Sequence, residues 1–269
     1  MIFHKNFDII FIENEVKELI KINKVYAVSD LHGMYELWEK IKNYIDETDI
    51  IYFLGDAADR GPHGIKIMKE LFTDKRVKYI LGNHEDIMLR EAPDIIKGRA
   101  FVGYLWYGNG GGPTADAFER LSEDSQMWLL NKINQLPREA IYVNKNGQTI
   151  FMCHAGTNPG WNEFRWEQKG VHDAYIWSRD HFHDEWEDGY EDYFIVHGHT
   201  PTPLLQKHFF WSDEIDRKAE IFRYANNHKI DIDCGCFFTG HIALLDLDTL
   251  EPIYFEDEKL YSDYQKGVE

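Results

Sequence analysis

Side chains with metal-binding chemistry recur at intervals along this chain. Asp30 and His32 stand two residues apart in the segment SDLHG. That spacing, at the end of a strand, can aim both side chains at one ion, while Gly33 lets the backbone turn away. Asp56, in GDAADRG, has two carboxylate oxygens and can bridge two cations about 3.5–4 Å apart. Together these residues predict a site shared by two metal ions.

Three later segments supply further ligands. GNHE, CHAG and GHTP contain Asn83, His154 and His199, which we expect to surround the second ion together with Asp56. Carboxylate, amide and imidazole groups suit Mn, Fe, Zn or Co, and the lack of thiolate argues against a purely structural zinc site. We expect two divalent ions, with Mn²⁺ as the first choice. Each residue alone is more often a helix cap or a core histidine, but six in order favour a site.

Apolar runs precede the first three segments and predict the strands that position them. These runs cover residues 25–28, 50–54 and 77–81. Apolar residues at helical spacing lie between them, at 37–45 and 65–72. This β-α-β-α-β order predicts a parallel sheet, whose ligands gather beyond the carboxyl ends of its strands. We therefore expect the metal-binding side chains to converge through topology.

Later apolar runs predict a second sheet. Residues 148–153 and 193–196 would deliver His154 and His199, and 229–233 and 242–247 would complete that sheet. The segment 157–192 shows no clear period, and we expect loops and short helices around the site.

Composition limits the class of protein. The 269 residues contain no Pro/Ser-rich linker or repeat, which predicts a single domain over 1–269 with a core at about 25–247. A net charge of −18 disfavours nucleic acid as a partner. Three cysteines without a CxxC pair favour a reducing cytoplasm. Apolar runs too short for a signal peptide or membrane span predict a soluble protein without a membrane partner.

Three further stretches, at 106–112, 176–179 and 232–235, complete a resemblance to a known family. Over most of 25–247 the chain resembles the PPP-type phosphoprotein phosphatases of the calcineurin-like metallophosphoesterases. It is most similar to the bacterial and phage branch that includes bacteriophage lambda serine/threonine phosphatase. Ser29 stands where that family usually has Gly, and Ala58 where Val is common, but neither is a proposed ligand.

The resemblance implies an α/β sandwich of two central mixed β-sheets flanked by helices. It also implies that one ion is held by Asp30, His32 and Asp56. The other ion would be held by Asp56, Asn83, His154 and His199.

A phosphoester hydrolase mechanism follows from these groups. Two cations lower the pKa of a shared water and hold it as hydroxide in line with phosphorus. Arg60 has a planar fork that can bind two phosphate oxygens. By resemblance Arg179 joins this substrate-binding clamp with Asn83, although an ion pair with Asp180 is the alternative.

The sequence also offers a general acid. His84 stands next to Asn83 and can protonate the leaving alkoxide, while Asp59 accepts its other ring N–H. Glu85 either orients the ligands or acts as an acid at a helix start. The glycines at 110–112 either approach the phosphate or form a flexible loop.

Other residues carry less weight. We expect His181 and His183 to be exposed and inert, although they could recruit a spare ion. The acidic stretch 184–192 is either a solvated face or a preference for basic phosphopeptides. We expect Cys234 and Cys236 to be core residues on one side of a strand. Cys153, beside His154, is a candidate for redox sensitivity.

Substrate alternatives remain open at this point. A serine/threonine protein phosphatase is our first expectation, and a symmetrical diadenosine tetraphosphate hydrolase is the alternative. The symmetrical hydrolases commonly have Ala at the place of Asp59 and Asp at that of Glu85, which favours the phosphatase. A nuclease or diesterase is disfavoured because Pro201 stands where those enzymes carry a second His. A phosphate-binding module without activity would have lost a ligand, and none is missing.

Overall fold

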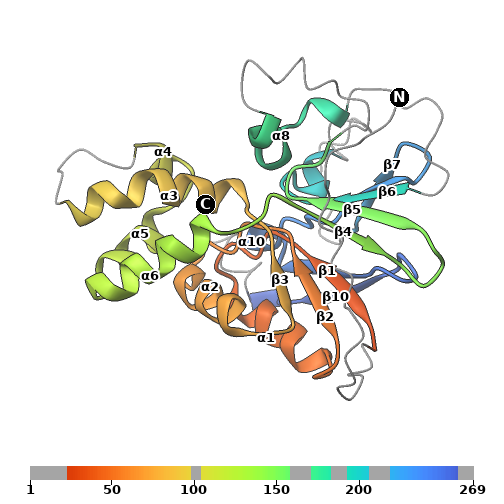
Figure 1. Ribbon diagram of the computed structural model, residues 1–269, viewed down its shortest axis with the longest axis horizontal. Coiled ribbons are helices and arrows are strands. Elements are labelled where there is room, and N and C mark those ends of the chain that lie inside the picture. Colours follow the sequence, from red (N-terminus) through yellow and green to blue (C-terminus); the bar gives the residue numbers. More distant parts are fainter. Residues whose placement is uncertain (1–22, 98–103, 158–170, 183–192, 206–218, 260–269) are drawn as a thin grey trace, which may run out of the picture.

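Two five-stranded mixed sheets pack face to face at the centre of the chain (Figure 1). The computed structural model describes residues 23–97, 104–157, 171–182, 193–205 and 219–259. The strand order is β10-β9-β1-β2-β3 in the first sheet and β4-β5-β6-β8-β7 in the second. This arrangement confirms the expected α/β fold with two mixed sheets.

The first sheet contains the predicted β-α-β-α-β unit. Its parallel strands are β1 (Val25–Val28), β2 (Ile50–Phe53) and β3 (Val77–Tyr79). They are connected by α1 (Tyr35–Tyr44) and α2 (Gly64–Thr73). Two antiparallel strands extend the sheet beyond β1, namely β9 (His241–Asp246) and β10 (Pro252–Glu256). The prediction that 242–247 belongs to the second sheet is therefore wrong.

The second sheet has three parallel strands between antiparallel edges. The parallel strands are β5 (Thr149–Cys153), β6 (Tyr193–His197) and β8 (Lys229–Asp231). The edge strands are β4 (Glu139–Val143) and β7 (Phe222–Tyr224). Strand β8 ends before Cys234 and Cys236, so these residues do not share a strand, although both are buried.

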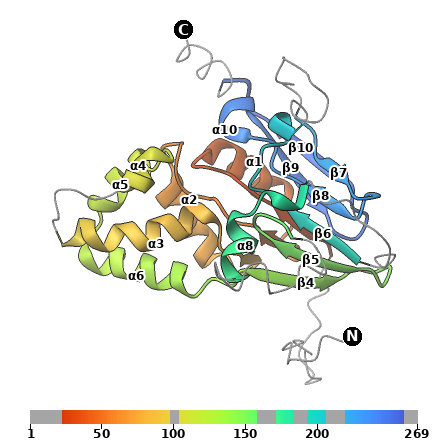
Figure 2. The same cartoon turned by 90° about the horizontal axis from the view of Figure 1, so that it is seen from above.

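Four helices gather to one side of the sheets (Figures 1 and 2). They are α3 (Asn83–Ile96), α4 (Tyr104–Gly108), α5 (Gly112–Glu119) and α6 (Glu123–Asn134). The described residues also form α8 (Val171–Trp177), the 3₁₀ turn η1 (Asp180–Phe182) and α10 (Cys236–Thr239). Within 157–192, α8 and η1 agree with the expected short helices, whereas 158–170 and 183–192 lie outside the described residues.

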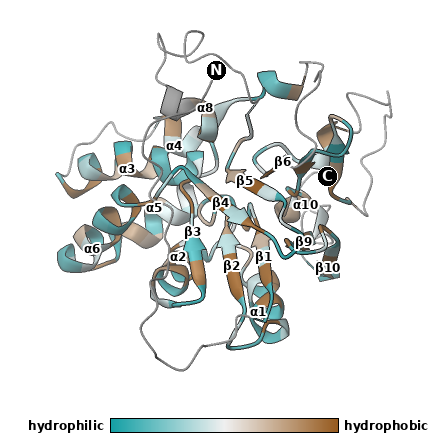
Figure 3. Cartoon of the chain, turned by 45° about the vertical axis from the view of Figure 1, so that its right-hand side comes forward, coloured by the Kyte–Doolittle hydropathy of each residue, from teal (hydrophilic) through white to brown (hydrophobic). Residues whose placement is uncertain are grey.

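Alternation along β1 divides the core in two. Val25 and Ala27 pack with residues of β5, β6 and β8 in an apolar layer between the sheets. Tyr26 and Val28 point the other way and pack against α1 and α2. Figure 3 shows the hydrophobic residues along the central strands, whereas α1 and α6 carry a hydrophilic face. Burial on both faces fixes the register, and with it the places where the strands end.

The carboxyl ends of the parallel strands are level. Val28 pairs with Phe53, and Phe53 pairs with Tyr79, so the segments that follow β1, β2 and β3 leave the sheet side by side. Strands β5 and β6 likewise deliver the segments that follow Cys153 and His197. The expected convergence of the segments that follow β1, β2 and β3 is therefore confirmed. None of the helices in the described part of the chain is long and apolar enough to span a membrane.

Candidate metal centre

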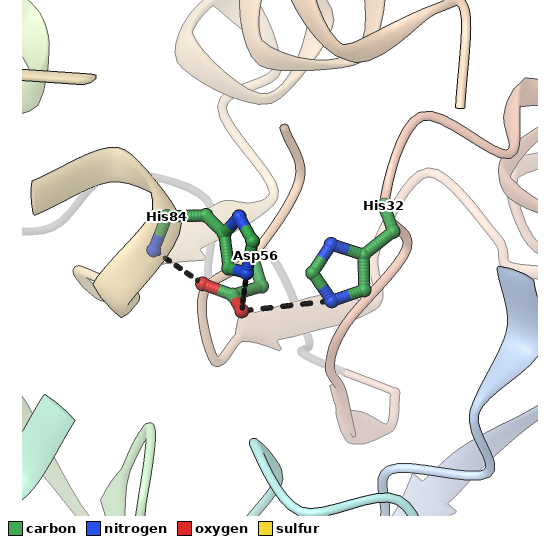
Figure 4. Close-up of side chains that lie close together, drawn as sticks. All are labelled: His32, Asp56 and His84. Atoms are coloured by element: carbon green, nitrogen blue, oxygen red, sulfur yellow. Dashed lines mark hydrogen bonds and ion pairs between the residues drawn. The ribbon is translucent and has the colours of Figure 1, made fainter. Parts of the chain in front are cut away.

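Asp56 lies between two groups of imidazoles. Its Oδ2 is 3.6 Å from His32 Nε2 and 3.8 Å from His84 Nε2, while its Oδ1 is 3.5 Å from His154 Nε2. Figure 4 shows the first of these groups, with both rings turned toward the carboxylate. His199 joins His154 and Asp56 in the second group, and in each group the ligand atoms lie within 4.8 Å of one another. One carboxylate thus belongs to two candidate ion sites.

Backbone carbonyls fix the orientation of two of the rings. His32 Nδ1 lies 3.0 Å from the carbonyl oxygen of Ala58, and His154 Nδ1 lies 2.7 Å from that of Leu54. A carbonyl oxygen only accepts, so each Nδ1 carries the hydrogen. The Nε2 atoms, which face Asp56, are then the atoms available to a metal ion.

Asn83 brings an amide oxygen to the second group. Its Oδ1 lies 2.9 Å from His154 Nε2 and 2.8 Å from His199 Nδ1, and these two nitrogens are 3.2 Å apart. All three side chains are buried. Three atoms able to donate a lone pair therefore point at one place, as a divalent cation requires.

Asp30 brings a second carboxylate close to His32. Its Oδ2 accepts hydrogen bonds from Ser29 Oγ and from the backbone N–H of His199. Its buried Oδ1, 3.8 Å from His32 Nε2, has no hydrogen-bond partner among the described residues. A buried oxygen without a partner is unfavourable, and a cation would satisfy it. The residues present thus fit two divalent cations, and their donor set is compatible with Mn, Fe, Zn or Co.

The backbone at this site is left-handed. Asp30, Asp56 and His199 have φ values of 55°, 60° and 75°. His32, Asp59 and Arg60 also have positive φ values, of 42°, 72° and 62°. This conformation costs non-glycine residues roughly 1–2 kcal/mol each. No sequence pattern signals this conformation, because Asp, His and Arg adopt it only where the surrounding fold holds them there.

Glu85 holds the turn that carries Asp56. Its buried carboxylate accepts the backbone N–H groups of Asp56 at 2.8 Å, Ala57 at 2.9 Å and Ala58 at 3.2 Å. It also accepts the N–H of Gly82 at 3.2 Å, as a helix-start acid would. Glu85 therefore combines the two roles considered for it: it orients the backbone of a proposed ligand, and it is an acid at the start of a helix. Its effect on the metal centre is to fix the backbone on which Asp56 stands.

Two glycines leave room for the carboxylates. A Cβ added at Gly82 would lie 2.2 Å from Asp56 Oδ1, and one added at Gly198 would lie 2.1 Å from Asp30 Oδ2. Neither distance is possible for a carbon atom. The glycines that open GNHE and GHTP are thus required by the close approach of the ligands, a signal that the sequence contains.

His84 and Asp59 form a separate buried pair. His84 Nδ1 lies 2.7 Å from Asp59 Oδ2, as predicted for an acid and its orienting carboxylate. Burial alone would lower the pKa of His84, but the carboxylates of Asp56 and Asp59 raise it above its ordinary value. His84 also belongs to the first candidate metal group, a place that the sequence did not predict. Its Nε2 lies 3.3 Å from Arg60 Nη2, which can only donate, so a ring that carries a proton at Nε2 requires this guanidinium to turn away from it.

The two arginines stand at the border of the centre. The Arg60 guanidinium lies 4.3 Å from the ring centroid of Phe237, and its backbone N–H donates to Gly110. Arg179 Nη2 donates to the carbonyl oxygen of His199 at 3.5 Å. Burial lowers the pKa of the Arg179 guanidinium, which speaks against the surface alternative. The role of both arginines in binding phosphate stays a proposal.

Other predicted features have clear outcomes. The expectation that His181 is exposed is wrong, because its ring is buried and bonds to the Ala155 carbonyl and the Tyr224 hydroxyl. Burial raises the pKa of Cys153 to about 12, which leaves no reactive thiolate near neutral pH. His183 and the acidic stretch 184–192 lie outside the described residues.

Comparison with known proteins identifies the family. Residues 23–244 match the family model of the calcineurin-like phosphoesterases. The chain belongs to the calcineurin-like phosphoesterase family. The matched range contains all the side chains of the candidate metal centre of this phosphoesterase.

Its curated relatives carry the names of dinucleotide hydrolases. A symmetrical bis(5'-nucleosyl)-tetraphosphatase of Buchnera aphidicola is 30% identical over 142 residues, or 51% of this chain and 46% of that protein. One from Legionella pneumophila is 25% identical over 211 residues, covering 74% and 64%. The asymmetrical enzyme PrpE of Oceanobacillus iheyensis is 26% identical over 253 residues, covering 82% and 87%. The chain spans about half the length of the first of these relatives.

Solved structures show the same fold. A candidate diadenosine tetraphosphatase superposes with a TM-score of 0.56 at 15% identity, covering 88% of this chain and 94% of that one. A serine/threonine phosphatase from Saccharomyces cerevisiae gives 0.54 at 13% identity, covering 88% and 80%. Identities this low bear on the fold alone. The resemblance to the lambda-type branch therefore stays a prediction.

Proton release should accompany metal binding. Burial would lower the pKa of His154, but Asp56 and Asp30 raise it to about 9 in the metal-free protein. At pH 7 the ring is therefore protonated, and a cation must displace that proton. We expect the apparent Mn²⁺ affinity to rise about tenfold per pH unit between pH 6 and 8, with release of about one proton.

Isothermal titration calorimetry in buffers of different ionisation enthalpy measures both quantities. The His154→Asn variant is the control and should lose the proton release together with one equivalent of metal. An affinity independent of pH would contradict a protonated His154.

Proposed function

We propose that this phosphoesterase hydrolyses dinucleoside polyphosphates, with diadenosine tetraphosphate cleaved symmetrically. The observation that carries the proposal is the pair of candidate ion sites sharing Asp56, beside two arginines that can bind phosphate oxygens. The names of the relatives from Buchnera and Legionella support the choice of substrate. A small nucleotide rather than a protein is therefore our first candidate for the partner.

The proposed mechanism divides the work among the side chains. Asp30 and His32 would hold one cation and Asn83, His154 and His199 the other, with Asp56 shared. When bound, two divalent cations lower the pKa of a water molecule and offset the charge on the phosphoryl oxygens.

The other groups act on the substrate. Arg60 and Arg179 bind phosphate oxygens through their planar forks and align the phosphorus. Where the leaving oxygen needs a proton, His84 donates it from Nε2, while Asp59 holds the ring through Nδ1. We further propose Mn²⁺ as the native metal and the cytoplasm as the compartment.

A phosphomonoesterase acting on phosphoserine and phosphothreonine is the second candidate. The buried His84–Asp59 pair favours it, because an alkoxide is a poor leaving group that needs a proton. The leaving group of a dinucleoside polyphosphate is a nucleotide, already stable as an anion. The His84–Asp59 pair is therefore more important for phosphoserine and phosphothreonine than for dinucleoside polyphosphates.

Product analysis tests the first proposal. We expect the manganese-loaded protein to convert diadenosine tetraphosphate into ADP faster than it releases phosphate from a phosphothreonine peptide. Formation of ATP and AMP would show asymmetrical cleavage, and faster peptide turnover would overturn the proposal in favour of the second candidate. Asp56→Asn, which removes the shared carboxylate, should abolish both activities and so controls for contaminating enzymes.

Substitution of Asp59 separates the two leaving groups. We expect Asp59→Asn to lower turnover of alkyl phosphoesters about 100-fold or more, the usual value for a general acid, and to leave dinucleotide turnover nearly unchanged. Metal content, measured by atomic emission, should stay at the wild-type level because Asp59 is not a proposed ligand. An equal loss on both substrates would remove the pair from its role as acid.

A further inference from the structure

The short helix α4 sends one side chain into the catalytic region. Trp106 is fully buried, whereas Tyr104 and Tyr107 on the same helix are exposed. The indole Nε1–H of Trp106 donates to Asp59 Oδ1 at 2.9 Å. A buried indole N–H requires an acceptor, and here the acceptor belongs to the proposed acid pair.

Asp59 divides its two oxygens between two rings. Oδ1 accepts from Trp106 and Oδ2 accepts from His84 Nδ1 at 2.7 Å. The backbone N–H of Asp59 donates to Thr114 Oγ1 at 2.8 Å, and the residue is fully buried with a positive φ. The direction of the carboxylate is thus fixed from both sides, and the bond to Trp106 at Oδ1 fixes where Oδ2 meets His84.

The glycines that follow α4 allow the backbone to pack closely against the indole ring of Trp106. A Cβ added at Gly111 would lie 1.9 Å from Trp106 Cδ1, so the backbone passes directly against the ring. The carbonyl oxygen of Gly110 accepts the backbone N–H of Arg60 at 2.8 Å. The glycine run at 110–112 is therefore not a loose loop, because it packs against Trp106 and accepts a hydrogen bond from Arg60.

We propose that Trp106 is a positioning residue which, through Asp59, sets how well His84 protonates the leaving oxygen. It thereby influences which leaving groups the enzyme can expel. The inference rests on the proposed phosphoester hydrolysis and deepens it. Trp106 acts through a second residue and not on the substrate, so its removal should change catalysis without changing substrate binding.

A second buried tryptophan provides a matched control. Trp38 in α1 is also fully buried, and its indole N–H donates to the Glu70 carboxylate at 3.0 Å. Trp38→Phe therefore removes the same kind of bond away from the proposed acid pair. Trp106→Phe keeps most of the ring volume. Incorporation of β-(benzothienyl)alanine at position 106, which keeps the bicyclic shape and lacks the N–H, separates the hydrogen bond from packing.

A series of aryl phosphates with increasingly poor leaving groups tests the catalytic effect. For Trp106→Phe we expect kcat to fall about tenfold on phenyl phosphate and less than twofold on p-nitrophenyl phosphate, with KM unchanged. In an Asp59→Asn background the same substitution should have no further effect that depends on the leaving group. A uniform loss across the series, or an equal effect of Trp38→Phe, would overturn the proposal.

NMR of the metal-free protein tests the contact without any activity. With ¹⁵N-labelled histidine, the His84 Nδ1–H resonance is identified by its loss in His84→Asn. We expect this resonance to shift in Trp106→Phe and in the benzothienyl variant, and to stay in place in Trp38→Phe. An unmoved resonance would overturn the proposal. If the wild-type protein cleaves no phosphoester, the proposed function fails while the NMR result still decides whether Trp106 acts on His84.

Discussion

The turn that carries Asp56 is the constraint on which the rest of the site depends. The Asp56 carboxylate faces imidazoles on both sides. The backbone at Asp56 is left-handed, and Gly82 lies close to this carboxylate. Glu85 offsets this strain by accepting four backbone N–H groups from the turn and from the start of α3. Without that carboxylate inside the protein, Asp56 would lack the fixed geometry needed to serve two ions.

The histidines of the site differ in their hydrogen-bond partners, and this difference indicates different chemical roles. His32 and His154 donate from Nδ1 to backbone carbonyls, which turns Nε2 toward Asp56. His84 donates to the carboxylate of Asp59, which favours the charged ring. At His154 a metal ion would take the place of the proton, whereas at His84 the proton has its own counter-charge. Two chemical roles thus coexist within one group of rings.

The sequence predicts the proposed metal ligands better than it predicts the residues that hold them in place. Strand ends and parallel order sufficed to bring Asp30, Asp56 and Asn83 together, because parallel strands deliver their carboxyl ends to one edge. The apolar run at 242–247 was assigned to the wrong sheet, since an antiparallel strand with two buried faces has no pattern that names its neighbour. The roles of Glu85 and Trp106 depend on hydrogen bonds between distant residues, such as Trp106 with Asp59, and no local pattern encodes these.

A crystal structure of the manganese-loaded protein with anomalous data tests the central claim most directly. The account predicts two anomalous peaks on opposite sides of the Asp56 carboxylate, one next to Asp30 and His32 and the other next to Asn83, His154 and His199. A single peak, or peaks that do not share Asp56, would contradict it.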